Sequence, residues 1–170
     1  IPGHPVAEAL AAAITAGNLP KQPLQALVMA HEFDLFADAM PDVTALEAYL
    51  GETSSMLIQM AAMILDAKHA PAAAEVAGLA GVAHGLAQIL ADPARRMQYL
   101  PPVMDVAAAI AHAWKRLAEA RALRPKLSPT LLPAFLPASL TGLYLRRIQA
   151  APDQRLAVTQ FRRQLTIWYY

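Results

Sequence analysis

The chain has 170 residues, of which 56% are hydrophobic, 16% are charged and none is cysteine. This length is enough for one domain with a sizeable core, and the composition excludes a disordered or solvating chain. The lack of cysteine excludes a disulfide framework, a cysteine nucleophile and a cysteine-bound zinc site. It fits a reducing compartment, so we expect a cytoplasmic protein.

The charged residues are distributed unequally between the two halves of the chain. Residues 1–90 carry nine carboxylates and two lysines, whereas residues 91–170 carry twelve Lys and Arg and four carboxylates. The net charges of the two halves are therefore −7 and +8. Such halves can attract each other, or the basic half can meet phosphate, anionic lipid or an acidic protein partner. Solvated helix faces that differ in sign explain the same distribution.

Three helices are predicted in the first part of the chain. The first covers residues 5–17 and ends in a Gly-Asn pair, which suits a left-handed helix end. The second covers residues 24–40, where a proline closes it. The third covers residues 44–67, and Thr44 and Glu47 at its start have the spacing of a capping box.

A fourth helix, residues 72–91, consists mainly of small and apolar residues. It is long enough to span roughly 30 Å, the thickness of a membrane core. Glu75, His84 and Gln88 lie within it, and the many Gly and Ala residues suit close packing on all sides. We therefore predict a buried central helix rather than a membrane span.

Three further helices complete the prediction. They cover residues 105–123, residues 127–149, whose first part three prolines must break, and residues 153–170. About seven helices in one domain over residues 1–170 give an all-α fold. The first residues do not have the features of a signal peptide and the last helix has no cap, so we expect a C-terminal fragment of a longer protein.

Asp34 and Asp38 are four residues apart and would lie on one face of the second helix. Paired carboxylates at this spacing can hold Mg²⁺ together with substrate phosphates. Exposed charges on an amphipathic helix explain the same pair.

A second group of candidates surrounds the end of the fourth helix. His84, Gln88 and Asp92 recur every four residues, and Arg95 and Arg96 follow, with guanidinium groups suited to phosphate. A hydrogen-bonded core histidine and solvated loop arginines are the alternatives. No nucleic-acid-binding motif accompanies the basic residues, so we do not expect a nucleic-acid partner.

The segments HEFDLFAD, LEAYLGETSS, GLAGVAHGLAQIL, the turn with Asp92, and QYLP follow one another in an order that resembles the squalene/phytoene synthase family. The resemblance implies a class I isoprenoid-synthase-like helical bundle whose N-terminal helices are missing here. Family enzymes join two prenyl diphosphates head to head, using Mg²⁺ held by two aspartate-rich motifs. By resemblance, the cavity or diphosphate-binding candidates are Asp34, Tyr49, His84, Gln88, Asp92, Arg95, Arg96 and Tyr99, with Asp92 as a metal ligand.

The chain departs from the enzymes of this family at the second motif. Asp92 matches its first acid, but the second acid is absent and the segment to Tyr99 is about one turn too short. AHAWKRLAEAR and LPAFLPASL resemble the branch that includes the mitochondrial complex I assembly factor and its bacterial relatives. This branch implies a catalytically degenerate domain that binds a lipid-like ligand or a protein partner, with at most peripheral membrane contact. The alternative is a working Mg²⁺-dependent head-to-head prenyltransferase.

Overall fold

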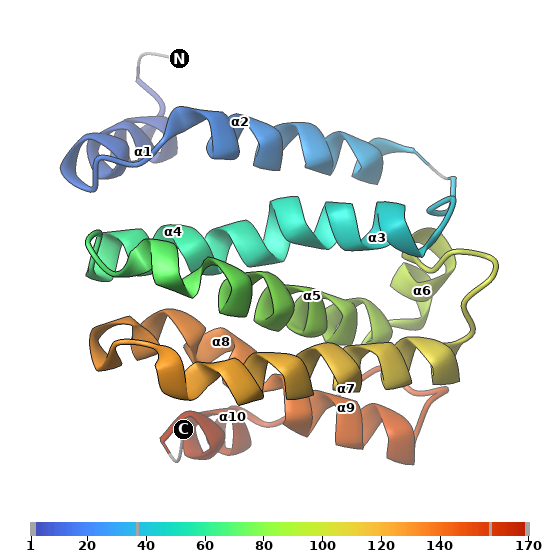
Figure 1. The fold of residues 1–170 in the computed structure, drawn as a ribbon. Helices are drawn as coiled ribbons and strands as arrows, with labels where there is room; N and C mark the ends of the chain where they lie inside the picture. Colours follow the sequence, from blue (N-terminus) through green and yellow to red (C-terminus); the bar gives the residue numbers. More distant parts are fainter. Residues whose placement is uncertain (1–2, 37, 157, 169–170) are drawn as a thin grey trace.

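The computed structural model describes residues 3–36, 38–156 and 158–168, and these residues form helices and loops without a strand (Figure 1). The all-α prediction is confirmed. The α-helices are α1 (Pro5–Ala16), α2 (Lys21–Ala30), α3 (Val43–Leu50), α4 (Met56–Leu65), α5 (Ala74–Leu90), α6 (Pro93–Tyr99), α7 (Val106–Leu123), α8 (Leu136–Ser139), α9 (Thr141–Ala150) and α10 (Gln160–Trp168). Shorter turns are η1 (His31–Leu35), η2 (Gly51–Ser55), η3 (Ala70–Ala73), η4 (Arg124–Lys126) and η5 (Pro129–Phe135), of which η2 is a π-helical turn.

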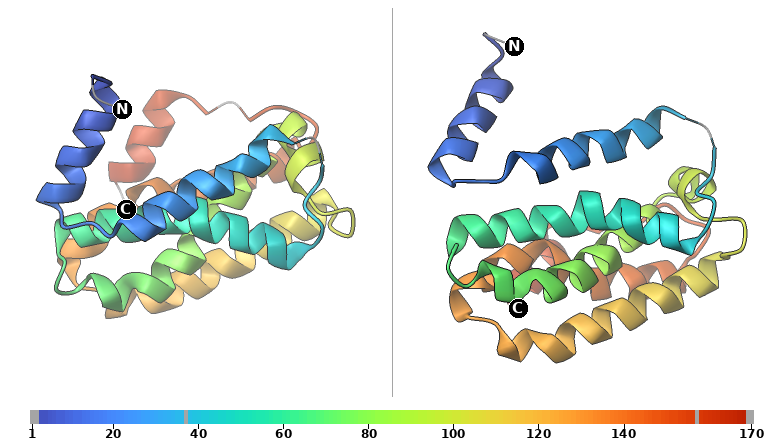
Figure 2. Two further views of the ribbon diagram at one scale, coloured as in Figure 1. Left: turned by 90° about the horizontal axis from the view of Figure 1, so that it is seen from above. Right: turned by 45° about the horizontal axis from the view of Figure 1, so that its top comes forward.

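Helix α5 is the central element of the bundle. It packs on α7 and α9 on one side and on α3, η2 and α4 on the other (Figures 1 and 2). Twelve of its 17 residues are buried. Ala70–Leu90 is apolar and long enough to cross a membrane, but 72% of its most apolar window is buried in the bundle. Packing within the core therefore explains its apolar character, as predicted.

Two glycines allow α5 to approach η2 closely. A Cβ atom on Gly81 would lie 2.3 Å from the Cα atom of Ser55, and one on Gly85 would lie 2.6 Å from a methyl group of Leu50. Ser55 Oγ also donates a hydrogen bond of 2.9 Å to the carbonyl oxygen of Gly78. The predicted helix over residues 44–67 thus contains a π-helical turn where it meets α5. Its cap is Asp42, whose Oδ1 accepts from the amide of Ala45, and not Thr44.

The prediction of one helix over residues 24–40 is wrong in its second half. Helix α2 ends at Ala30, and the tighter turn η1 ends at Leu35. The side chain of Gln98 contacts the segment that follows α2, because its Nε2 lies 3.1 Å from the carbonyl oxygen of Phe36 and 3.5 Å from that of Asp34. Asp38 follows in a loop, so Asp34 and Asp38 do not share a helical face.

The C-terminal third agrees with the sequence in part. The proline-rich segment is broken, as predicted, into η5, α8 and α9. The last helix begins at Gln160 rather than at residue 153. The predicted helical positions 37, 157, 169 and 170 lie outside the described residues.

Candidate functional site

Asp34 accepts hydrogen bonds from two tyrosines that are distant in the sequence. The hydroxyl groups of Tyr49 on α3 and Tyr99 on α6 lie 2.9 and 2.6 Å from its Oδ1. His31 Nδ1 lies 2.8 Å from the other carboxylate oxygen. Turn η1 therefore places one carboxylate between two helices, and three of the predicted candidates come together there.

Aromatic rings surround this carboxylate. Tyr49 and Tyr99 are buried, and their ring centroids are 5.4 Å apart. The ring of Phe33 lies 6.0 Å from that of Tyr49 and 5.8 Å from that of Tyr99. Tilted aromatic contacts of this kind stabilise a fold beyond the burial of their area. We call Phe33, Asp34, Tyr49 and Tyr99 the tyrosine cluster.

Burial and hydrogen bonds in the tyrosine cluster set the protonation states of Asp34, Tyr49 and Tyr99. Burial raises the pKa of Asp34, but hydrogen bonds from Tyr99, His31 and Tyr49 outweigh it, so the pKa lies below the ordinary value. Burial, together with hydrogen bonds to the Asp34 carboxylate, raises the pKa of the phenols of Tyr49 and Tyr99. At neutral pH the aspartate is ionised and both phenols keep their protons.

His84 lies in the core between α5 and α9. The amide nitrogen of Gln88 lies 2.9 Å from its Nε2, so Nε2 accepts and the protonated Nδ1 donates to Thr141 Oγ1 at 3.2 Å. Its ring stacks on that of Tyr144 with a centroid distance of 6.4 Å. Burial lowers the pKa of His84 to about 4, so the ring is neutral at pH 7.

Asp92 begins α6. Its Oδ1 accepts a hydrogen bond of 3.1 Å from the amide of Ala94, and Pro93 occupies the first helical position. Its Oδ2 lies 3.1 Å from a guanidinium nitrogen of Arg155. Both carboxylate oxygens of Asp92 are therefore engaged, one as a helix cap and one in an ion pair.

A pocket of about 350 Å³ lies beside Asp92. Arg95 and Arg163 hold guanidinium groups over aromatic rings at its edge, 5.2 Å from the centroid of Tyr99 and 5.9 Å from that of Tyr144. Such cation–π contacts restrict where the two guanidinium groups point. We call this the arginine pocket; its lining residues are Gln88, Ala91, Asp92, Arg95, Tyr144, Arg155, Leu156 and Arg163.

Arg96, the neighbour of Arg95, has a different environment. It is buried, and its Nε donates a hydrogen bond of 2.8 Å to the carbonyl oxygen of Leu90. Its Nη1 donates to the carbonyl oxygen of Pro152. The side chain thus joins the end of α5 to the loop before α10 and does not line the arginine pocket.

The residues of the arginine pocket do not fit Mg²⁺. This ion binds hard oxygen ligands, usually carboxylates and waters, and it is repelled by cations. Asp92 is the single carboxylate of the pocket and stands beside three arginines. Within residues 3–36, 38–156 and 158–168, no three His, Asp or Glu side chains are grouped so that they could hold a metal ion. The pocket fits an anion instead.

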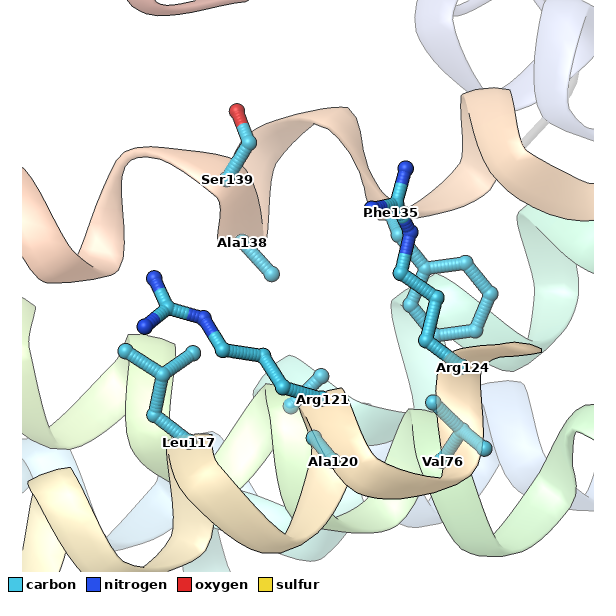
Figure 3. A pocket seen from close by; sticks show the side chains of 9 residues that line it. Val76, Leu117, Ala120, Arg121, Arg124, Phe135, Ala138 and Ser139 are labelled. Atoms are coloured by element: carbon cyan, nitrogen blue, oxygen red, sulfur yellow. The ribbon is translucent and has the colours of Figure 1, made fainter. Parts of the chain in front are cut away.

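A second pocket, between α5, α7 and α8, is too small for a ligand. Figure 3 shows Arg121 and Arg124 reaching from the end of α7 toward α8, with Phe135 and Ala138 opposite. The cavity measures about 30 Å³. A space of this size holds about one water molecule.

Some residues of the arginine pocket were not among the predicted candidates. Arg155, Arg163 and Tyr144 come from the C-terminal third of the chain. Arg163 belongs to the basic doublet Arg162-Arg163, which is visible in the sequence. The sequence does not indicate that Arg163 lines the same pocket as Asp92. The Asp92-Pro93 pair, in contrast, has the pattern of a helix cap followed by a first-turn proline and could have indicated α6.

The chain is an all-α bundle around a Gly/Ala-rich central helix, which is consistent with an isoprenoid-synthase-like helical domain. The model of the squalene/phytoene synthase family matches residues 1–102, which is more than half of the chain, and the chain belongs to this family. No curated protein and no solved structure matches the chain. The matched residues include Asp34, Tyr49, Asp92 and Tyr99.

Proposed function

We propose that this chain is a squalene/phytoene synthase-like domain that has lost catalysis and binds a lipid-like molecule through its phosphate or diphosphate head group. The observation that carries the proposal is the state of Asp92. Its two carboxylate oxygens are engaged by the amide of Ala94 and the guanidinium group of Arg155. Each oxygen already has a partner other than a metal ion, and Asp92 has no second acid of the kind that the family enzymes place one helical turn further on.

The three arginines support direct binding of an anion. Guanidinium groups bind phosphate oxygens in pairs and keep their charge at any physiological pH. Mg²⁺-assisted cleavage of a diphosphate needs several carboxylates to hold the metal ions beside the leaving group. The arginines of this pocket can neutralise a bound head group directly, without carboxylates and metal ions. This arrangement favours binding of the head group over its cleavage.

The size of the arginine pocket supports the same conclusion. Its volume of about 350 Å³ is near the lower end of the range for small-molecule sites, about 300–1,000 Å³. This space, with its mainly charged and polar lining, suits a phosphate or diphosphate head group.

Calorimetric titration of the full-length protein with a non-hydrolysable farnesyl diphosphate analogue tests the proposal. We expect binding of similar strength in Mg²⁺ and in a chelator. Replacing Arg95 with Ala removes one charge-assisted contact and is expected to weaken binding about tenfold. Arg146→Ala, on the exposed surface of α9 and outside the pocket lining, is the matched control.

A working Mg²⁺-dependent prenyltransferase is the second candidate, and family membership favours it. Incubation of the same protein with farnesyl or geranylgeranyl diphosphate and Mg²⁺, followed by product analysis, separates the two functions. Formation of a head-to-head product that is lost in Asp92→Ala would overturn the binding proposal. Binding without product, in chelator as well as in Mg²⁺, would support it.

A protein partner is compatible with the same degenerate domain. The opposite net charges of residues 1–90 and 91–170 favour electrostatic attraction to a charged partner. The resemblance to the assembly-factor branch favours this role. If the analogue does not bind in either condition, the head-group proposal fails and a partner role becomes the better explanation.

A further inference from the structure

Helix α10 presents its apolar side to solvent. Phe161, Leu165 and Trp168 are spaced by four and three residues, so they lie on one face of the helix. Their exposed fractions are 71%, 45% and 85%. A surface helix normally turns its apolar stripe toward the core. Here the orientation is the reverse.

The opposite side of α10 fixes this orientation. Ile167 packs against the main hydrophobic core. Arg163 points the same way, since its guanidinium group lies over the ring of Tyr144 and lines the arginine pocket. The helix therefore cannot rotate to bury Phe161 and Trp168 without exposing Ile167 and breaking the contact of Arg163.

Exposed arginines lie on the same side of the molecule as α10. Arg146 and Arg147 on α9 are exposed. Helices α9 and α10 lie on the side of the molecule opposite to α1 and α2 (Figure 1). Arg162, which adjoins the apolar face, is exposed. An aromatic and aliphatic face beside exposed arginines is typical of helices that lie in the head-group region of an anionic bilayer.

We propose that α10 docks this chain on an anionic lipid surface, with Phe161, Leu165 and Trp168 inserted among the head groups. The occupant is a lipid surface rather than a protein groove because the aromatic side chains at both ends of the apolar face suit the membrane interface, while the exposed Arg146, Arg147 and Arg162 complement anionic lipid. This inference does not depend on the proposed head-group function.

Sedimentation of the full-length protein with vesicles tests the docking. We expect it to bind vesicles of equimolar phosphatidylcholine and phosphatidylglycerol, and to bind phosphatidylcholine alone much more weakly. Binding to the anionic vesicles should fall with added salt. The double substitution Phe161→Ser and Trp168→Ser should weaken it about tenfold or more, because both side chains lose their burial in the interface. Val103→Ser, at another highly exposed apolar position, is the matched control and should bind like the unmodified protein.

Fluorescence gives a second readout that does not depend on sedimentation. The chain has two tryptophans, so Trp114→Phe leaves Trp168 as the reporter. We expect its emission to shift to the blue with anionic vesicles and to be quenched by brominated lipid. Unchanged emission would overturn the proposal, as would equal losses in the α10 and Val103 variants. If the double substitution abolishes self-association measured by sedimentation velocity and leaves vesicle binding intact, the apolar face is an interface between two copies and the proposal is wrong.

Discussion

The hydroxyl group of Tyr99 donates a hydrogen bond of 2.6 Å to Asp34, although 65 residues separate them in the sequence. This contact joins η1 to α6, and Tyr49 extends it to α3. The position of α6 sets the position of Arg95, whose guanidinium group lies over the ring of Tyr99. The tyrosine cluster therefore supports one wall of the arginine pocket.

Replacing Tyr99 with Phe should lower the free energy of unfolding by about 1 kcal/mol, because it removes a part-buried hydrogen bond to an ionised carboxylate that solvent also reaches. Tyr49→Phe should have a similar effect for the same reason. Urea unfolding of both single variants and of the double variant measures the two losses and their coupling. If both single variants are as stable as the unmodified protein, the hydrogen bonds to Asp34 contribute nothing to the fold.

Gly81 and Gly78 provide a matched pair on α5. Alanine at Gly81 would place its Cβ atom 2.3 Å from the backbone of Ser55, and backbone cannot move aside cheaply. We expect Gly81→Ala to cost about 1–3 kcal/mol or more, since η2 must shift away from α5. Alanine at Gly78 meets no atom within 4 Å and should stabilise the helix by up to about 1 kcal/mol. Thermal unfolding of the two variants distinguishes them, and equal melting temperatures would contradict this packing.

Helix periodicity and composition were sufficient to predict the all-α fold and the buried central helix. The long apolar run of α5 and the prolines after Leu127 have direct local consequences, and both predictions are confirmed. The end of α2 could not be predicted in this way. The segment that follows α2 also depends on a distant contact, because Gln98, 62 residues beyond Phe36, donates a hydrogen bond to the carbonyl oxygen of Phe36.

In the candidate site, too, the sequence indicated individual residues but not the contacts between distant segments. Asp34, Tyr49 and Tyr99 were chosen by resemblance, but their common hydrogen bonds depend on how three separate elements pack. Arg95 and Arg96 are equivalent in the sequence, yet one lines the arginine pocket and the other is buried. The difference arises from the phase of the short helix α6, which the sequence analysis did not predict.

Arg95 and Arg96 should therefore respond differently to substitution. Arg96→Ala leaves the carbonyl oxygens of Leu90 and Pro152 without their donor and should cost about 3 kcal/mol of stability. Arg96→Lys should also lose stability, because an ammonium group does not reproduce the guanidinium fork. Arg95→Ala should change stability by less than about 1 kcal/mol, the value of an exposed cation–π contact. Denaturant unfolding measures all three, and a cost at Arg95 as large as at Arg96 would contradict the assignment.

The pKa of His84 predicts how stability depends on pH. Burial lowers this pKa from 6.5 to about 4, so between these values the unfolded chain binds a proton at the ring and the folded chain does not. The free energy of unfolding therefore falls as the pH is lowered through this window, by up to about 3 kcal/mol from this group, and it regains that contribution above pH 6.5.

His84→Gln tests this dependence, because glutamine does not titrate and retains hydrogen-bonding groups for Gln88 and Thr141. We expect the variant to be less stable at pH 7, since it loses the stacking of His84 on Tyr144. Between pH 6.5 and pH 4 its stability should decline less steeply than that of the unmodified protein. Carboxylates such as Asp34 titrate in both proteins, so the difference between the two urea-unfolding series isolates the histidine. Parallel curves would show that the ring of His84 is protonated as readily in the fold as in the unfolded chain.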